Sequence, residues 1–202
     1  MKLYYSPGAC SMASHIVLRE LGENFELERV DTATKKTEKG SDFYAVNSKG
    51  KVPALAVDGE VLTEGPSILQ FVADRAGDRH LAPQAGTLDR ARVNELLNFT
   101  GTELHVAFHP LFNPASTDAA KEAARKNVGT KFDWLEARLA DGRLYLTGQN
   151  FTVADAYAFV ASNWANFTGI DLGAWPKLKA FVERVAARPA AQAAMKAEGL
   201  IA

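Results

Sequence analysis

The stretch YYSPGACSMASHIVLRE, residues 4–20, decides the fold of the N-terminal part of this chain. Short aromatic and apolar residues over 2–5 predict a strand, Pro7 and Gly8 predict a turn, and apolar residues recur with helical spacing from Ser11 onwards. Residues 27–30 predict a second strand. Because a crossover through a helix joins parallel strands, residues 2–30 predict a strand–helix–strand unit.

The next segments extend this unit into a small α/β domain. The polar, lysine-rich residues 32–51 predict a loop with at most a short helix. Two apolar runs, 54–57 and 61–63, flank the turn signal Asp58-Gly59 and predict an antiparallel hairpin. A helix follows Gly65, with Pro66 in its first turn. The predicted element order is therefore βαβαββα.

A second domain differs in its pattern. Residues 77–87 are polar and contain Pro83, which suits a linker. Beyond this linker strand patterns end, and helices are predicted over 88–109, 118–139, 152–164 and 177–187, with an alanine-rich segment at 186–197 that favours helix. Thr152 and Asp155 match a capping box, which is folding information. We expect an α/β domain over 1–80 and an all-α domain over 88–202.

Composition excludes several classes of function. The chain has 202 residues, 47% of them hydrophobic, which is enough for a substantial core. Because 23 Lys and Arg residues balance 24 Asp and Glu residues, the basic footprint of a nucleic-acid-binding protein is missing. No apolar run is long enough to span a bilayer, and the start MKLYYSPG does not resemble a signal peptide, so we expect a cytoplasmic protein without a membrane partner.

Cys10 is the single cysteine of the chain, and it stands between the turn and the first helix. The amides and dipole of a helix N-terminus favour the reactive thiolate, although a free cysteine is more often a small buried apolar residue. With no second thiol, any sulfur chemistry needs a partner thiol or a substrate. Ser11 and Ser14 are expected to cap the helix, and Ser11 is also placed to donate a hydrogen bond to a bound sulfur.

Two further segments of the first domain can bind a ligand. A cis bond before Pro53 would turn the backbone of Val52 outward to pair with an extended peptide, whereas a trans bond would give an ordinary turn. Glu64 and the N–H of Gly65, at the start of a helix, suit an ammonium and a carboxylate, unless Thr63 or Glu64 simply caps that helix. Nearby cations are mostly a solvated face, and one of them is available to hold a carboxylate: Lys35, Lys36, Lys39, Lys49 and Lys51.

The first long helix of the second domain carries a polar stripe at spacings of three and four: Asn98, Thr102, His105 and His109. The two histidines are four residues apart, but Val106 stands where the zinc-protease pattern needs glutamate, so we expect no metal. A stripe with His105 as a hydrogen-bond donor near a ligand fits better.

These segments together resemble the cytosolic glutathione S-transferases, most closely their bacterial beta class. The resemblance extends over almost the whole chain and is carried by YYSPGACSMASHIVLRE, GKVPAL, LTEGPSI, NFTGTELHVAF, PLFNP and FTVADAYAF, in the family's order. It implies a thioredoxin-like N-terminal domain, an all-helical C-terminal domain, a homodimer, and glutathione as co-substrate.

The resemblance also implies a site. Cys10 corresponds to the residue that lies beside the glutathione sulfur and forms a mixed disulfide with it, and the positions that match the glutathione site are Ala9, Cys10, Lys35, Val52, Pro53, Glu64, Gly65, Asn98 and His105. One departure is Val106, where relatives often carry lysine. Four aromatic residues are expected walls of an electrophile pocket, although aromatic residues at this spacing are more often core: Phe108, Phe112, Tyr157 and Trp164.

The leading hypothesis is a detoxifying transferase that conjugates glutathione to hydrophobic electrophiles, with Cys10, His105 and Ser11 at the reacting sulfur and possible thiol-disulfide or peroxidase activity through Cys10. A glutathione-dependent reductive dehalogenase or isomerase would share every one of these features. A non-catalytic ligand carrier on the same scaffold is the third alternative, and the retained glutathione residues argue against it.

Overall fold

The computed structural model describes residues 1–202, which form two compact units. Unit 1 comprises Met1–Ala82 and Ala187–Ala202, and unit 2 comprises Pro83–Ala186. Each unit is described by itself. The sequence analysis divided the chain at residues 80 and 88 and left the C-terminal segment with the helical domain, whereas in the structure this segment belongs to unit 1.

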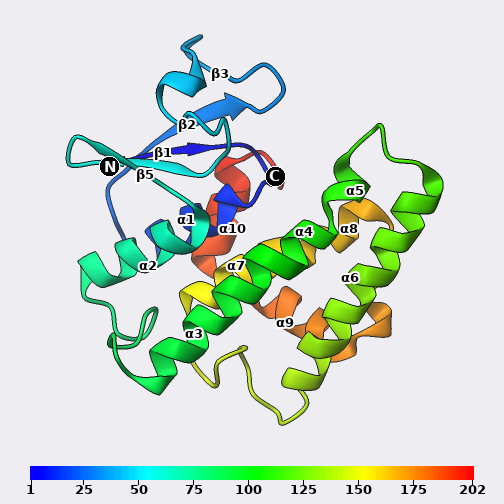
Figure 1. The fold of residues 1–202 in the computed structure, drawn as a ribbon. Helices are drawn as coiled ribbons and strands as arrows, with labels where there is room; N and C mark the ends of the chain where they lie inside the picture. The colour runs from blue at the N-terminus through cyan, green and yellow to red at the C-terminus, as the bar shows by residue number, and fades with distance from the viewer. The chain divides into compact units, whose positions relative to one another are not determined.

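Unit 1 is built on a five-stranded mixed sheet in the order β3-β2-β1-β4-β5 (Figure 1). The strands are β1 Lys2–Tyr5, β2 Glu26–Asp31, β3 Lys36–Thr37, β4 Ala54–Val57 and β5 Glu60–Thr63. As predicted, β1 and β2 pair in parallel and β4 and β5 form an antiparallel hairpin. The short strand β3 and the 3-10 turn η1, Phe43–Ala45, lie in the segment that was predicted as a loop.

The hairpin turn illustrates why these residues fold as they do. Asp58 and Gly59 both have positive φ values, 52° and 84°. This backbone matches the right-handed twist of the flanking strands, and Asp and Gly tolerate it better than other residues. The turn fixes the register, so Leu55 lies opposite Leu62 and Ala54 opposite Thr63.

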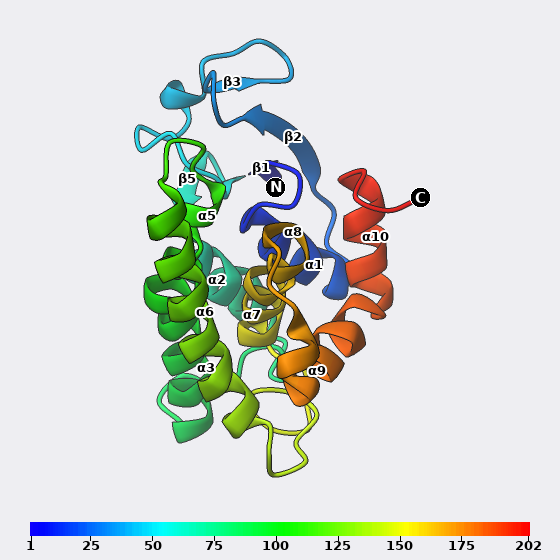
Figure 2. The same cartoon turned by 90° about the vertical axis from the view of Figure 1, so that its right-hand side faces the viewer.

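Three helices complete unit 1: α1 Ser11–Glu20, α2 Gly65–Ala76 and α10 Pro189–Ala197. Both α2 and α10 pack against α1. Figures 1 and 2 show α10, the red helix at the end of the chain, beside the blue α1. Arg188 stabilises the contact between α10 and α1, because its guanidinium donates to both carboxylate oxygens of Glu20 at 2.6 and 2.9 Å. The chain end is therefore part of the unit that carries Cys10.

Unit 2 is entirely helical, as predicted. Its elements are α3 Leu88–Phe99, η2 Thr100–Leu104, α4 His105–Ala107, α5 His109–Phe112, α6 Asp118–Arg138, α7 Val153–Asn163, α8 Ala165–Thr168, η3 Leu172–Ala174 and α9 Pro176–Ala186. The apolar helix α7 has buried residues at almost every position and packs against α3 and α9. A helix that is apolar on all sides belongs in a core. No helix of the chain is long and apolar enough to cross a membrane.

The long predicted helix over 88–109 contains an irregularity. Residues 100–104 form a π turn, η2, between α3 and α4. Such turns interrupt the α-helical spacing and often occur at functional sites. The polar stripe that was predicted from a regular helix is therefore broken between Asn98 and His105.

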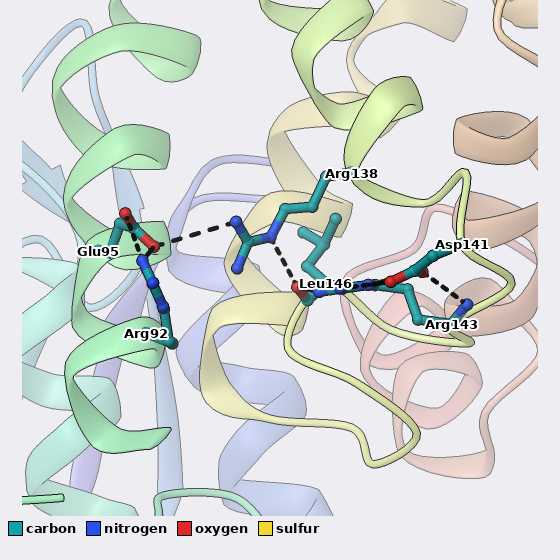
Figure 3. A network of polar contacts seen from close by, with 6 residues as sticks. All are labelled: Arg92, Glu95, Arg138, Asp141, Arg143 and Leu146. Carbon is teal, nitrogen blue, oxygen red and sulfur yellow. Dashed lines mark hydrogen bonds and ion pairs between the residues drawn. The ribbon is translucent and has the colours of Figure 1, made fainter. Parts of the chain in front are cut away.

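A polar network holds the loop between α6 and α7 (Figure 3). Arg138 Nε and Arg143 Nη1 both donate to the carbonyl oxygen of Leu146, at 2.8 and 3.2 Å. The Leu146 amide in turn donates to Asp155 Oδ1 at 2.8 Å, and Asp155 Oδ2 accepts from the Thr152 amide at 2.8 Å. The predicted capping box is therefore present, and it ties this loop to the start of α7.

Candidate functional site

The turn between β1 and α1 presents Cys10. Gly8 takes a positive φ of 69°, and the Ala9 amide donates to the Ser6 carbonyl at 3.0 Å, which closes the turn. Cys10 follows directly as the N-cap of α1. Its thiol Sγ lies 3.4 Å from the carbonyl oxygen of Val52 and donates to it. Residues from two distant segments therefore meet at the sulfur.

Burial of the Cys10 thiol opposes the thiolate that the helix N-terminus favours. The residue as a whole is partly exposed, but surrounding atoms desolvate its thiol, and this burial raises the pKa of Cys10 to about 11. Hydrogen bonds from the amides of Cys10 and Ser11 lower the pKa, as expected at a helix N-terminus, but by less than burial raises it. A thiolate also could not donate to the Val52 carbonyl. Burial therefore favours the protonated thiol at neutral pH.

Ser11 does not have the place that the sequence suggested. Helix α1 has no side-chain cap. The Ser11 side chain is fully buried, and its Oγ accepts from the Ser6 amide at 3.2 Å and donates to the Ser6 carbonyl at 3.3 Å. The hydroxyl therefore holds the turn in front of Cys10, and we assign no catalytic role to it. Ser14 is also fully buried.

Val52 and Pro53 lie directly before β4, and the peptide bond between them is cis. Pro53 approaches the start of α2, where an added Cβ on Gly65 would lie 3.8 Å from the proline ring. The two predicted binding segments, Val52-Pro53 and Glu64-Gly65, are thus neighbours in unit 1. Cys10 joins them through its hydrogen bond to Val52.

Glu64 is not a helix cap. It precedes α2 with a positive φ of 71°, makes no capping hydrogen bond, and leaves its carboxylate largely exposed. Lys49 pairs with this carboxylate and also donates to Thr63 Oγ1 at 2.8 Å. A non-glycine residue in this conformation is strained, which is typical of functional sites. The capping alternative is therefore not what the structure contains.

Two lysines complete the predicted residues of unit 1: Lys35 and Lys51. Lys35 has a φ of 60° and donates from Nζ to the Gly50 carbonyl at 2.8 Å. The charges of Glu64 and Lys51 both act on the Cys10 thiol, the first raising its pKa and the second lowering it. We define the thiol cluster as Ala9, Cys10, Val52, Pro53, Glu64 and Gly65, with Lys35, Lys49 and Lys51 as its cations.

Unit 2 contains a second predicted set around His105. Its Nδ1 lies 2.8 Å from the Tyr157 hydroxyl, and its ring meets Trp164 edge-on at 4.8 Å between centroids. Trp164 also contacts Phe108 at 5.6 Å and Phe112 at 5.4 Å. We define these five residues as the aromatic cluster. The structure thus brings His105 together with all four predicted wall residues.

The four predicted wall residues differ in their exposure to solvent. Phe112 is 49% exposed, whereas Phe108, Tyr157 and Trp164 are buried. The alternative that aromatic residues at helical spacing are core is therefore correct for three of the four. Asn98 is exposed, and its carbonyl accepts from Thr102 Oγ1 at 2.9 Å.

His105 and His109 lie in two successive short helices, α4 and α5. The rings of His105 and His109 stand edge to face with centroids 5.3 Å apart. No group of three or more His, Cys, Asp or Glu side chains in the chain is arranged to hold a metal ion.

One contact at the turn before Cys10 was missed by sequence reasoning. Glu198, in the C-terminal segment, accepts from the Gly8 amide and from His15 Nδ1, both at 2.9 Å. Arg19 Nε donates to His15 Nε2 at 2.8 Å, so Nδ1 is the nitrogen that carries the proton. His15 and the Glu198 side chain are fully buried. The one signal for this contact in the sequence was His15, because a histidine in the first helix needs a hydrogen-bond acceptor when it is buried.

Comparisons with known proteins agree with this geometry. Residues 8–75 match a family model described as glutathione S-transferase, N-terminal domain, and residues 99–189 match glutathione S-transferase, C-terminal domain. Glutathione S-transferase GstA of Escherichia coli O157:H7 is 44% identical over 201 residues, which covers 99% of this chain and 100% of the relative. Glutathione S-transferase GST-4.5 of Xanthomonas campestris pv. campestris is 41% identical over 207 residues, with 99% and 100% covered.

Solved structures extend the comparison to the whole backbone. A sphingomonad glutathione S-transferase complexed with glutathione is 51% identical and has a TM-score of 0.95, with 100% of both chains covered. A bacterial beta class glutathione S-transferase of Sphingomonas chungbukensis is 50% identical with a TM-score of 0.96, again over 100% of both chains. Sequence and backbone agree from end to end, and the chain therefore belongs to the glutathione S-transferase family, in its bacterial beta class.

Proposed function

We propose that this protein is an enzyme that conjugates glutathione to hydrophobic electrophiles. The observation that carries the proposal is the thiol cluster, in which Cys10 Sγ donates to the Val52 carbonyl and Pro53 lies against Gly65. A thiol, an outward strand backbone and a helix N-terminus thereby meet in one unit. The solved relative that is complexed with glutathione supports this ligand.

The chemistry of glutathione matches the groups of the cluster. Glutathione has a thiol, a peptide backbone, two carboxylates and one ammonium. Lys35 would hold the glycyl carboxylate; its ammonium has three donors, and Gly50 takes one of them. The Val52 backbone would pair with the cysteinyl unit, flanked by Ala9 and Pro53.

The γ-glutamyl end would bind at the start of α2. The exposed Glu64 carboxylate would take the ammonium, and the amides that begin at Gly65 would take the carboxylate. Lys49 pairs with Glu64 in the structure, so the ammonium of the ligand would replace or share that cation. His105 and Asn98 would act on the ligand sulfur as hydrogen-bond donors.

The reaction requires glutathione as a thiolate. Its thiol loses a proton to solvent, its sulfur attacks the electrophilic carbon, and the leaving group departs with the electron pair of the broken bond. Burial raises the pKa of Cys10 and favours its protonated thiol, which would turn from the Val52 carbonyl to donate to the ligand thiolate and leave that carbonyl to pair with the ligand backbone. A hydrogen bond to the charged form lowers the pKa of the bound thiol.

The same neighbours permit a redox reaction. With a peroxide as oxidant, Cys10 and glutathione together lose two protons and two electrons, an S–S bond forms, and the peroxide is reduced to water or alcohol. A second glutathione thiolate would attack this mixed disulfide and release glutathione disulfide, which regenerates the Cys10 thiol.

The assembly and setting follow from the same resemblance. We include in the proposal a cytoplasmic homodimer with a detoxifying role. Light scattering of the purified chain tests the dimer, and a molar mass of one chain would contradict it.

A substrate panel tests the reaction. The purified protein is incubated with glutathione and with aryl halides, epoxides, unsaturated carbonyl compounds and cumene hydroperoxide, and products are identified by mass spectrometry. A thioether product supports conjugation. Halide release with formation of glutathione disulfide would instead indicate reductive dehalogenation, rearrangement without net use of glutathione would indicate an isomerase, and glutathione binding without any turnover would indicate a carrier.

A further inference from the structure

The contact between His105 and Tyr157 has a use beyond packing. Tyr157 lies in the buried helix α7 and is itself buried, and its hydroxyl is 2.8 Å from His105 Nδ1. A buried hydroxyl needs a hydrogen-bond partner, and this imidazole nitrogen supplies one. The bond connects α7 to the first residue of α4, directly after the π turn.

We propose that Tyr157 is a positioning residue for the glutathione-dependent reaction: its hydroxyl donates to His105 Nδ1, which fixes the ring and keeps the imidazole proton on Nε2. The inference rests on the proposed function, in which His105 acts on the ligand sulfur. It replaces the role of pocket wall that the sequence suggested for Tyr157.

The neighbours of the ring restrict its orientation. Trp164 meets the imidazole edge-on at 4.8 Å with an interplanar angle of 71°, and His109 meets it at 5.3 Å and 84°. A half-turn of the ring would exchange Nδ1 for a carbon and leave the buried Tyr157 hydroxyl facing C–H. Packing therefore fixes the plane of the ring, and the hydrogen bond selects the edge that faces Tyr157.

The direction of the hydrogen bond decides what His105 can do. A neutral imidazole has one donor nitrogen and one acceptor nitrogen. A phenol is the more acidic partner, so the favourable arrangement has the Tyr157 O–H donating to Nδ1, and Nε2 then carries the proton. In this tautomer His105 stabilises a thiolate through Nε2–H and does not act as a base at that nitrogen. The opposite tautomer would turn a lone pair towards the negative sulfur.

The first test observes the tautomer of His105 directly in the wild-type chain. The full chain, labelled with ¹⁵N in its histidines, is examined by long-range ¹H–¹⁵N correlation at neutral pH, with His105→Ala used to assign the signals. We expect His105 to show a protonated Nε2 and an unprotonated Nδ1. A protonated Nδ1 in the neutral ring would overturn the proposal.

The second test is a double-mutant cycle with Tyr157→Phe, His105→Ala and the double variant, assayed with glutathione and 1-chloro-2,4-dinitrobenzene. Removing the hydroxyl should lower kcat about tenfold, with the KM for glutathione changed by less than about twofold, because a His105 ring that is no longer fixed loses about one hydrogen bond from Nε2–H to the reacting sulfur. In the His105→Ala background the same substitution should have almost no effect. Equal effects in both backgrounds would overturn the proposal.

A control variant separates positioning from stability. Tyr145→Phe removes a hydroxyl from another buried tyrosine of unit 2, whose ring contacts Phe151 at 5.6 Å. It should leave kcat and the His105 spectrum unchanged, and an equal loss of kcat in this control would contradict a specific role of Tyr157. If His105→Ala itself turns over at the wild-type rate, the proposed role of His105 at the sulfur fails, whereas the spectra of wild type and Tyr157→Phe still decide the contact.

Discussion

Replacing Glu198 by alanine should destabilise unit 1 strongly, although the residue lies close to the end of the chain. The carboxylate accepts hydrogen bonds from the Gly8 amide and from His15 Nδ1, each at 2.9 Å. Both the Glu198 side chain and His15 are fully buried. Alanine would leave the buried His15 Nδ1–H without its acceptor and would remove one acceptor from the partly buried Gly8 amide.

The magnitude follows from these two bonds. The buried His15 donor costs about 1–3 kcal/mol when it loses its partner, and the partly buried Gly8 amide adds a smaller cost, so the total is about 2–4 kcal/mol. Because the C-terminal segment can shift and admit water, we expect the free energy of unfolding to fall by about 3 kcal/mol. Glu198→Gln keeps one acceptor oxygen but turns an NH₂ group towards the second donor, so its loss should be about half as large.

Urea unfolding of the full chain, followed by circular dichroism, measures these losses. Glu60→Ala is the matched control, because Glu60 is exposed at the β4–β5 turn of the same unit, and its effect should stay within about 0.5 kcal/mol. A Glu198→Ala variant that unfolds at the same urea concentration as this control would refute the reasoning. The turn that carries Cys10 would then be held by its local hydrogen bonds alone.

Three further predictions concern the thiol cluster and the start of α7. The raised pKa of Cys10 predicts that iodoacetamide alkylates the thiol slowly in the absence of glutathione. The alkylation rate should rise about tenfold per pH unit from pH 7 to pH 10. A rate that levels off near pH 8 would show an ordinary or lowered pKa of Cys10. Glu64→Ala should reduce retention on glutathione resin, whereas Lys49→Ala, which removes only the internal partner of that carboxylate, should not; equal retention in wild type and Glu64→Ala would exclude Glu64 from the site. Asp155→Ala removes the acceptor of the Leu146 and Thr152 amides, both at 2.8 Å, and should lower the free energy of unfolding by about 3 kcal/mol, as measured by urea titration. Asp171 is the exposed cap of a short 3-10 turn, so the control Asp171→Ala should lower this free energy by less than about 1 kcal/mol.

Local signals in the sequence predicted those features that local chemistry determines. The positive φ values of Asp58 and Gly59 produce the hairpin that this dipeptide predicted. The strand–helix–strand pattern around Cys10 became β1, α1 and β2, and the parallel pairing of β1 with β2 follows from the crossover. Thr152 and Asp155 form the expected capping box.

Features that depend on tertiary packing were missed or wrong. A helix N-terminus favours a Cys10 thiolate, but burial of the thiol in the folded chain raises its pKa. The π turn at 100–104 has no local signal in TGTEL, and it breaks the spacing on which the polar stripe was based. The contact of Glu198 with Gly8 joins residues 190 positions apart, which no periodicity reports.

The aromatic cluster could be predicted from the sequence in part. Its members were named from the resemblance, and the structure brings them together around His105. Burial then separates Phe112, which is half exposed, from Tyr157, which serves His105 through its hydroxyl. Sequence identified the residues, and only the side-chain geometry distinguished a wall from a positioning group.

A crystal of the full chain soaked with glutathione tests the central claim most directly. The account predicts that the glutathione sulfur lies within hydrogen-bonding distance of Cys10 Sγ, that the cysteinyl backbone pairs with the Val52 backbone, and that the γ-glutamyl end lies at Glu64 and Gly65. Glutathione bound with its sulfur away from Cys10, or no bound glutathione at millimolar concentration, would contradict it.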